Sequence, residues 1–140
     1  MCNKYDKVTV AKFHKLQVKD VYKETDDCSV ITFDVPEELS EEFNFRQGQH
    51  LTLKADIDGE DTRRSYSLCS SPVDNQWKVA VKQIYGGKFS TYVNEQLAAG
   101  DTIEVMEPSG MFGVNVEPEK EKNYLFFAAG SGITPVLSMI

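Results

Sequence analysis

The chain has 140 residues, of which 41% are hydrophobic and 11% aromatic, a composition that suits one compact domain and the beginning of a second. Its 22 acidic and 15 basic residues give a formal net charge of −7, which argues against nucleic acid or an anionic membrane as a main partner. The apolar runs are too short to span a bilayer, and no signal peptide is visible.

The cysteines and histidines show no pattern typical of a metal site. Cys2, Cys28 and Cys69 are odd in number and widely spaced. They form neither a disulfide framework nor a ligand motif, so a reducing, cytoplasmic setting is expected. His14 and His50 each lack a second ligand at metal spacing, and we expect both to be strand-surface residues. We predict no metal site and no Ser–His–Asp arrangement.

Short strands separated by turn residues are expected along most of the chain. The predicted strands lie at residues 5–21, 28–35, 45–53, 63–72, 77–85 and 102–107. The first of these reads as one long bent strand or as two short ones. Residues 36–43 predict an acidic loop or helical turn in solvent, and Asp58–Gly59 predicts a tight hairpin turn. This spacing of strands favours an antiparallel barrel or sandwich.

Residues 63–72 combine a doubled arginine with aromatic and hydroxyl side chains. Strand alternation places Arg64, Tyr66 and Leu68 on one face. A guanidinium can bind phosphate oxygens with two hydrogen bonds, while a phenol ring packs against a flat heterocycle. An ordinary barrel strand with a surface arginine and a half-buried tyrosine explains the same residues, and this stretch alone leaves both interpretations open.

The hydrophobic period changes after two consecutive glycines. From Phe89 onward, apolar residues recur every fourth position, which predicts one helix of about ten residues that ends at Gly100. Gly86, Gly87 and Lys88 before this helix could form a phosphate seat, because glycine permits close approach and free N–H groups favour an anion. Taken alone, the pair favours a simpler interpretation, a turn that needs glycine for its geometry.

The last segment resembles the start of a nucleotide-binding unit. Residues 124–129 form a continuous apolar run, as expected of a strand buried in a parallel sheet. A glycine turn at 130–135 follows, and Pro135 suits the first turn of a helix. A complete βαβ unit needs roughly 30 residues, so the chain reads as a fragment. Its last segment must then fold back on the barrel, pair with another molecule or be disordered.

The order of these motifs resembles the ferredoxin–NADP reductase superfamily. An Arg-x-Tyr-Ser run at 64–67 is followed by Gly-x-x-Ser at 87–90 and by Gly-x-Gly-x-x-Pro at 130–135. Each motif is weak alone, but three in this order argue against chance. The amino-acid sequence around the first motif is most similar to that of reductases of multicomponent oxygenases, such as the phenylacetate-degradation reductase.

The resemblance implies a fold and a division into domains. Residues 1–116 would form an antiparallel Greek-key β-barrel of about six strands with one helix, which binds FAD. Residues 117–122 would be a linker. Residues 123–140 would be the first strand, turn and helix of a truncated, Rossmann-like NAD(P)-binding domain.

The resemblance also implies roles for single residues. Arg64 would bind the FAD pyrophosphate, and Tyr66 would pack on the isoalloxazine ring. Ser67 would reach the flavin N5 atom, so strand alternation is expected to break there. Thr134 would approach flavin and nicotinamide, which makes Ser67 and Thr134 the implied catalytic residues. His50 falls where the family lines the flavin pocket. Further FAD contacts are implied for Ser65, Val81, Lys82, Gly86, Gly87, Lys88, Phe89 and Ser90, and NAD(P) contacts for Gly130, Ser131, Gly132, Ile133, Thr134 and Pro135.

The implied function is that of an NAD(P)H-dependent FAD oxidoreductase. It would pass single electrons to a [2Fe–2S] centre or a ferredoxin-like acceptor, such as a component of the phenylacetyl-CoA oxygenase system. The plant-type iron–sulfur spacing is absent, so a [2Fe–2S] centre would belong to a missing C-terminal domain. These 140 residues alone are expected to be inactive, and the choice of NADH or NADPH would lie beyond Ile140. A non-catalytic regulatory or interaction module that keeps the flavin-barrel fold is the alternative.

Overall fold

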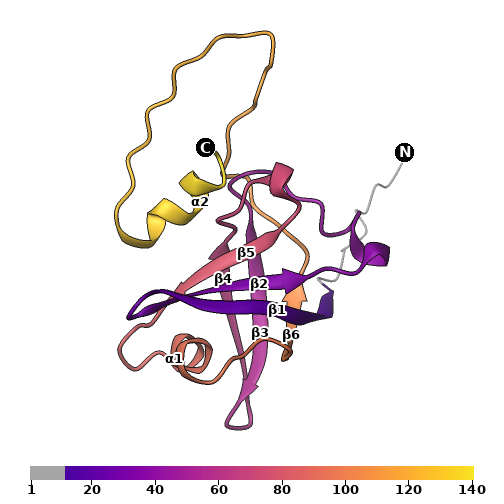
Figure 1. Cartoon of the computed structure of the whole chain (residues 1–140), viewed down its shortest axis with the longest axis vertical. Helices are drawn as coiled ribbons and strands as arrows, with labels where there is room; N and C mark the ends of the chain where they lie inside the picture. The colour runs from indigo at the N-terminus through magenta and orange to yellow at the C-terminus, as the bar shows by residue number, and fades with distance from the viewer. Residues whose placement is uncertain (1–11) are drawn as a thin grey trace, which may run out of the picture.

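The computed structural model describes residues 12–140, which form one strongly curved antiparallel sheet followed by a looser C-terminal segment (Figure 1). The strands are β1 (Phe13–Thr25), β2 (Cys28–Asp34), β3 (His50–Ile57), β4 (Glu60–Ser67), β5 (Trp77–Lys82) and β6 (Thr102–Met106). Their order is β4-β3-β6-β1-β2-β5, with neighbouring strands antiparallel. The edge strands β4 and β5 meet at a bridge between Leu68 and Val79, so the sheet is barrel-like without being closed. The predicted mainly β fold of about six antiparallel strands is confirmed.

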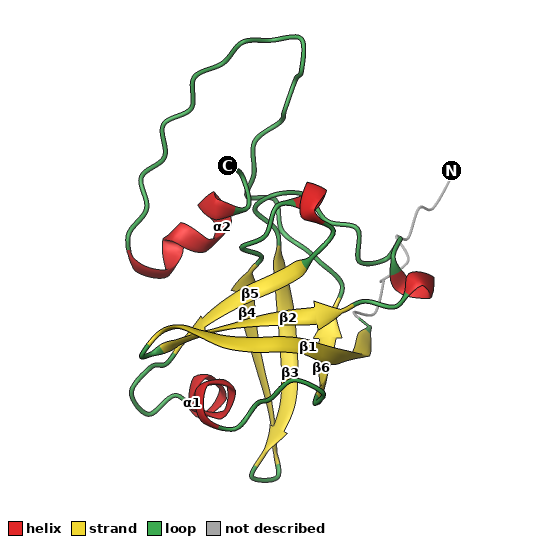
Figure 2. Ribbon diagram, in the orientation of Figure 1, coloured by secondary structure: helices red, strands yellow, loops and turns green. Residues whose placement is uncertain are grey.

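The helices lie near the ends of the sheet, and within residues 12–140 none is long and apolar enough to cross a membrane. They are α1 (Lys88–Glu95), α2 (Ile133–Leu137) and the 3-10 helices η1 (Glu37–Leu39), η2 (Pro72–Asp74) and η3 (Gly130–Gly132). Figure 2 shows α1 beneath one end of the curved sheet and α2 beside the opposite end. The helix and the C-terminal turn that carry two of the three sequence motifs therefore lie at opposite ends of the sheet.

The hydrophobic core fills the inside of the curved sheet, because inward and outward residues alternate along each strand. In β1, Leu16 and Val18 are buried while the residue between them is exposed. Phe89 and Val93 of α1 insert into the same core from below and are equally buried. Burying one such side chain stabilises the fold by about 1.5–3 kcal/mol. The core therefore holds the start of α1 firmly against β4 and β5.

The predicted hairpin between β3 and β4 is confirmed. Asp58 and Gly59 have φ angles of 55° and 78°, the left-handed values that a two-residue turn requires. The flanking strands are in register from the pair Ile57–Glu60 to the pair His50–Ser67. β4 therefore begins and ends earlier than the predicted 63–72, and η2 follows it.

The predicted end of the helix at Gly100 is wrong. α1 ends at Glu95, because Gln96 leaves the helical conformation with φ −124°. Gly100 instead turns the chain into β6 with φ +94°, and its N–H donates to the Val18 carbonyl at 2.8 Å. The positive φ of Gly100 thus serves the turn that leads into β6, and its backbone N–H bonds to β1.

Two predictions of solvent exposure are also wrong. Phe43, in the supposedly solvated acidic loop, is 0% exposed, and Trp77 Nε1–H donates to its carbonyl at 2.7 Å. His14, expected on a strand surface, is 7% exposed, because it shares the inward face of β1 with Leu16. In both cases charged neighbours in the sequence obscure a residue whose side chain packs into the interior. The part of the predicted first strand before residue 12, like Cys2, lies outside the described residues.

The apolar run at 124–129 forms no strand, although the sequence predicts one. Leu125 and Phe127 are 79% and 90% exposed. A strand of a parallel sheet needs neighbouring strands, and the described residues provide none for this run. The chain then folds back on the barrel through α2, where Val136 is buried. Of the arrangements left open for the last segment, the structure shows this one.

Candidate functional site

The turn into α1 is fixed by a glycine and a serine. Gly87 precedes the helix, and a Cβ on it would lie 2.6 Å from Ser90 Oγ. Ser90 Oγ accepts the Ile84 N–H at 3.1 Å and donates to the Gly87 carbonyl at 3.2 Å. The first intrahelical bond is donated by Thr91 to Gly87 at 3.0 Å. The N–H groups before Thr91 lack intrahelical partners, and the positive end of the helix dipole favours an anion there.

A lysine of this turn pairs with a carboxylate of β4. Lys88 Nζ, at the start of α1, donates a hydrogen bond to the Glu60 carboxylate at the start of β4. That hydrogen bond and the charge of Lys88 lower the pKa of Glu60, with a smaller contribution from the charge of Arg64. Arg64 is exposed, and its guanidinium donates to the Arg63 carbonyl at 2.6 Å. Lys88 and Glu60 thus form a charge pair beside the turn, and Arg64, on the same face of β4 as Glu60, has a weaker effect on this carboxylate.

Tyr66 lies next to the same helix start. Its ring centroid is 6.0 Å from that of Phe89, with the planes tilted by 33°. The ring is half-buried against the core, and this burial raises the pKa of the phenol, an effect that the nearby charge of Arg64 opposes. Tyr66 therefore contacts the start of α1 through Phe89, and Arg64 lies two positions before it on the same face of β4.

Ser65 and Ser67 lie on the other face of β4. The Ser65 hydroxyl is 2.8 Å from Thr52 Oγ1 on β3, across the exposed side of the hairpin. The pairing with β3 is regular through Ser67, so the expected break of alternation at this residue is wrong. Ser67 is the last residue of β4.

His50 pairs with Ser67 in the β3–β4 ladder and is held from its other side by the segment after β6. Its Nε2 lies 3.1 Å from Ser109 Oγ, and the two backbones exchange hydrogen bonds of 2.9 and 3.0 Å. A Cβ on Gly110, which has φ +119°, would lie 3.0 Å from His50 Nδ1. His50 is therefore a fixed residue beside the end of β4.

A wide groove of ≈ 600 Å³ lies between the outer face of β5, the β1–β2 hairpin and the C-terminal turn. It brings Lys82 close to Gly130, Ser131, Ile133 and Thr134, whereas Gly132 and Pro135 do not line it. Thr134 Oγ1 donates to the Ser131 carbonyl at 2.8 Å. The groove thus joins two sets of predicted residues that are far apart in the sequence.

The walls of this groove contain residues that the sequence analysis did not single out. Ala80 and Lys78 share the outer face of β5 with Lys82, and the same alternation that buries Val79 could have shown this. Val81 lies on the inward face and is 0% exposed, so its side chain belongs to the core. Only backbone contacts remain for Val81, and Asn94 Nδ2 already donates to its carbonyl at 2.9 Å.

The groove is lined by charged residues of both signs, Glu24, Asp27, Asp74, Lys78 and Lys82, together with the thiol of Cys69. Burial raises the pKa of Cys69 to about 11, and its Sγ donates to the Lys78 carbonyl at 3.4 Å. Lys82 Nζ lies 3.3 Å from Asp27 Oδ2. A hydrogen bond from Thr25, followed by one from Lys82, lowers the pKa of Asp27. The groove therefore offers a neutral thiol and a lysine whose charge is partly compensated.

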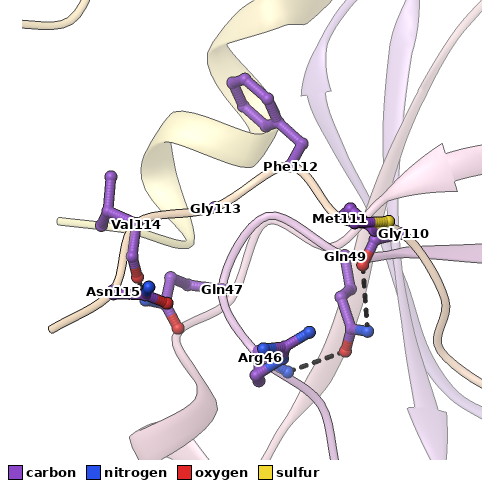
Figure 3. A pocket seen from close by; sticks show the side chains of 9 residues that line it. All are labelled: Arg46, Gln47, Gln49, Gly110, Met111, Phe112, Gly113, Val114 and Asn115. Carbon is purple, nitrogen blue, oxygen red and sulfur yellow. Dashed lines mark hydrogen bonds between the residues drawn. The ribbon is translucent and has the colours of Figure 1, made fainter.

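A second, much smaller cavity lies where two loops pack against each other. It has a volume of ≈ 70 Å³ and lies between residues 46–49 and 110–115 (Figure 3). Gln49 Nε2 donates to the Gly110 carbonyl at 3.3 Å, and its Oε1 accepts the Arg46 N–H at 2.8 Å. Gln47 Nε2 donates to the Val114 carbonyl at 2.6 Å. This cavity is too small for a cofactor, and its polar groups bond to one another.

The geometry of the site agrees with the sequence relationship of the chain. Residues 15–113 match the family model for the oxidoreductase FAD-binding domain. The chain belongs to this family. It is 52% identical over 128 residues to a component of 1,2-phenylacetyl-CoA epoxidase from Escherichia coli K12, covering 91% of this chain and 36% of that protein. It is 42% identical over 127 residues to the ferredoxin reductase component of 3-ketosteroid-9-alpha-monooxygenase from Rhodococcus rhodochrous, covering 89% and 35%.

Solved structures give the same relationship. Phthalate dioxygenase reductase matches with a TM-score of 0.72 and 28% identity, over 90% of this chain and 38% of that one. That protein is described as a modular structure for electron transfer from pyridine nucleotides to [2Fe–2S]. A flavohemoglobin from Malassezia yamatoensis with bound FAD and heme matches with a TM-score of 0.76 and 22% identity over 92% and 33%, a similarity of fold. This FAD-binding domain thus spans about a third of the length of these relatives and is related to reductase components of oxygenases.

Proposed function

We propose that this FAD-binding domain holds its cofactor along the surface from the start of α1 to the groove beside β5. The FAD pyrophosphate binds between Arg64 and the N–H groups at the start of α1, where Lys88 adds a second positive charge. Tyr66 packs against the flavin ring, which extends around the end of β4 toward Thr134. The groove has room for a flat heterocycle of this size.

The residues of the chain fit FAD by their chemistry. Arg64 and Lys88 supply charge for the phosphates, and Gly87 leaves room for the Ser90 hydroxyl that fixes the turn before α1. Cys69 faces the groove as a neutral thiol, so it brings no negative charge toward the ring. Ser67 and Thr134 are the hydroxyl groups that we assign to the flavin edge. When bound, FAD supplies the conversion between two-electron and one-electron transfer, and the protein contributes position and electrostatics.

We further propose that the domain serves an NAD(P)H-dependent oxidoreductase of an oxygenase system. NAD(P)H would deliver hydride on the side of the groove where Gly130 to Thr134 lie, and single electrons would leave to a [2Fe–2S] or ferredoxin-like acceptor. Support comes from the relatives, which are a component of phenylacetyl-CoA epoxidase and a ferredoxin reductase component. The assignment of residues 123–140 to an NAD(P)-binding domain, and of 117–122 to a linker, belongs to this proposal.

The observation that carries the proposal is the contact of Tyr66 with Phe89 at the start of α1, on the face of β4 that also carries Arg64. The experiment is to mix the purified chain with FAD, remove free FAD by gel filtration and record the absorption spectrum of the protein fraction. Bands of bound flavin at about one equivalent are expected. A colourless protein fraction at FAD concentrations well above micromolar would refute the proposal. A reductase assay of a longer protein that contains this domain, with NADH or NADPH and an artificial acceptor, separates a catalytic from a regulatory role.

A further inference from the structure

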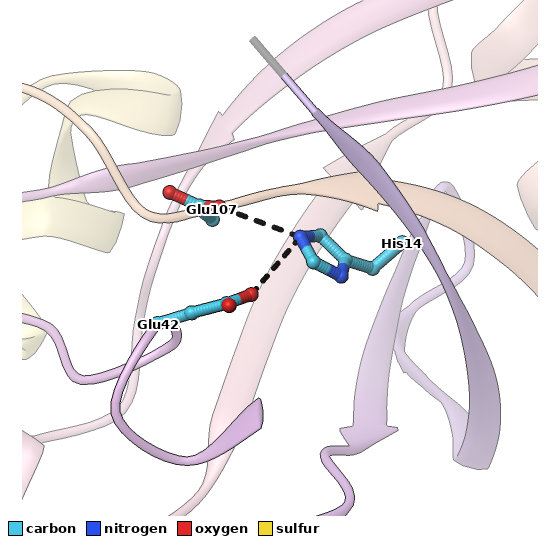
Figure 4. Close-up of side chains that lie close together, drawn as sticks. All are labelled: His14, Glu42 and Glu107. Atoms are coloured by element: carbon cyan, nitrogen blue, oxygen red, sulfur yellow. Dashed lines mark hydrogen bonds and ion pairs between the residues drawn. The ribbon is translucent and has the colours of Figure 1, made fainter. Parts of the chain in front are cut away.

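A histidine and two glutamates from three separate segments converge at the side of the barrel (Figure 4). His14 lies on β1, Glu42 in the loop after η1 and Glu107 directly after β6. His14 Nε2 is 3.3 Å from Glu42 Oε2 and 3.4 Å from Glu107 Oε1. The ligand atoms of all three lie within 4.8 Å of one another. The sequence spacing hides this group, because His14 and Glu107 are 93 positions apart.

The imidazole of this group is held in a fixed orientation. The His14 side chain is 6% exposed, and its ring meets the Phe43 ring edge-on with centroids 5.4 Å apart. The two carboxylates are 45% and 42% exposed, so water can reach them from the other side. A buried nitrogen donor thus points outward at two carboxylates that approach from the solvent.

Both carboxylates face the same nitrogen atom, whereas a single Nε2–H can point directly at only one of them. A charge-assisted hydrogen bond typically has a length of about 2.7–2.9 Å. The observed distances of 3.3 and 3.4 Å are longer than that. Distances of this size also fit two edges of a metal tetrahedron. Two ligands bound at about 2.0–2.1 Å with a tetrahedral angle are about 3.4 Å apart.

We propose that His14, Glu42 and Glu107 bind a divalent cation of the Zn²⁺ class. One imidazole nitrogen and two carboxylate oxygens are ligands that Zn²⁺ accepts, with the fourth position open to water. Ca²⁺ requires 6–8 oxygen ligands and Mg²⁺ an octahedral oxygen shell, so this donor set favours neither. The cation joins β1, the loop after η1 and the segment after β6. This site is independent of FAD.

Zinc titration of the untagged, chelator-treated chain by calorimetry is the direct test. The expected result is one equivalent of Zn²⁺ bound by the wild type. Glu42→Gln and Glu107→Gln keep the shape of exposed side chains, and each should weaken binding by at least about tenfold, since even the loss of an outer-shell partner costs that much. Glu41→Gln, the same charge change in the same loop, should leave binding unchanged. Absence of Zn²⁺ binding by the wild type, or equal binding by all variants, overturns the proposal.

Cobalt substitution tells this site apart from binding by cysteine. The wild type with one equivalent of Co²⁺ should show the visible spectrum of tetrahedral nitrogen and oxygen ligation, without a thiolate charge-transfer band, and Glu107→Gln should lose it. A thiolate band would place the metal on cysteine and refute the assignment. Zn²⁺ should also raise the melting temperature of the wild type more than Mg²⁺ does, because a ligand that binds only the folded state stabilises it. An equal shift for both ions would contradict the proposal.

Discussion

Glu60 is an acidic residue beside the proposed pyrophosphate site. Its carboxylate accepts a hydrogen bond from Lys88, and the charge of Arg64 also lowers its pKa. We assign both cations to the pyrophosphate. The lowered pKa of Glu60 keeps it negatively charged at neutral pH. An incoming phosphate must therefore displace or tolerate this carboxylate.

We expect Glu60→Gln to bind FAD more tightly than the wild type. The change removes a competing negative charge and frees Lys88. Because exposed charge pairs of this kind are weak, the gain should be only about two- to fivefold in affinity, and salt should reduce it. Fluorescence titration with FAD at two ionic strengths measures it. Weaker FAD binding by Glu60→Gln would show that Glu60 helps to position Lys88 for the cofactor.

The thiol of Cys69 gives a prediction about pH. Burial raises its pKa to about 11, so Cys69 stays a neutral thiol at pH 8 and should be alkylated slowly there. In the unfolded chain the thiolate forms at lower pH, so the folded state binds more protons between pH 9 and 11 and loses stability as the pH rises through that range. The alkylation rate of Cys69, measured by peptide-resolved mass spectrometry at a series of pH values, reports when its thiolate forms. A rate that reaches its plateau by pH 9 would contradict the assigned environment.

At the scale of elements, α1 depends on one buried side chain. Asn94 Oδ1 accepts hydrogen bonds from Ser29 Oγ and Lys23 Nζ, both at 2.9 Å. Its Nδ2 donates to the Val81 and Ser90 carbonyls, also at 2.9 Å. This one amide connects α1 to β1, β2 and β5. The orientation of the phosphate-binding helix end therefore rests on a fully satisfied polar group inside the barrel.

Replacing Asn94 by alanine should destabilise the domain by about 2–4 kcal/mol, because several buried polar groups lose their partner at once. Chemical denaturation followed by tryptophan fluorescence measures the free energy of unfolding. Gln96→Ala, an exposed change at the end of the same helix, is the matched control and should shift that free energy by less than about 0.5 kcal/mol. If the two variants had equal stability, the proposed role of Asn94 would be wrong.

The elements that could be predicted from sequence are those whose signal is local. Alternating apolar residues indicated the strands, and Asp58–Gly59 indicated the hairpin between β3 and β4. Phe43 and His14 were misplaced because their burial depends on contacts with segments that are distant in the chain. The contact of Tyr66 with the start of α1 could be inferred only through family resemblance, since no periodicity relates β4 to α1.

At the scale of the whole molecule, residues 112–129 and the C-terminal helix leave a large apolar surface exposed. Phe112, Leu125 and Phe127 are 64%, 79% and 90% exposed. The matched part covers 36% and 35% of the two relatives. The run at 124–129 could not be placed correctly from sequence, because its hydrophobicity is suited to neighbours that residues 12–140 do not provide.

For the same reason we expect no NAD(P)H turnover by these 140 residues, even when FAD is bound. The nicotinamide would contact only the turn at 130–135, without the strands and helices that complete a dinucleotide-binding unit. Stopped-flow mixing of the FAD-loaded chain with NADH or NADPH, followed by flavin absorbance, measures this. Reduction at rates typical of flavin reductases would show that the groove beside β5 is sufficient for hydride transfer.

The central claim is that Arg64, from β4, binds the FAD pyrophosphate together with the start of α1. It is tested most directly by FAD titration of Arg64→Ala beside Arg63→Ala. The neighbouring Arg63 is engaged by Asp61 at 2.9 and 3.0 Å, so it is the matched control. Loss of one charged hydrogen-bond partner should cost Arg64→Ala about 1.5–3 kcal/mol of FAD binding, or about tenfold or more in affinity. Arg63→Ala should bind like the wild type, and the reverse order, or unchanged affinity in Arg64→Ala, would contradict the account.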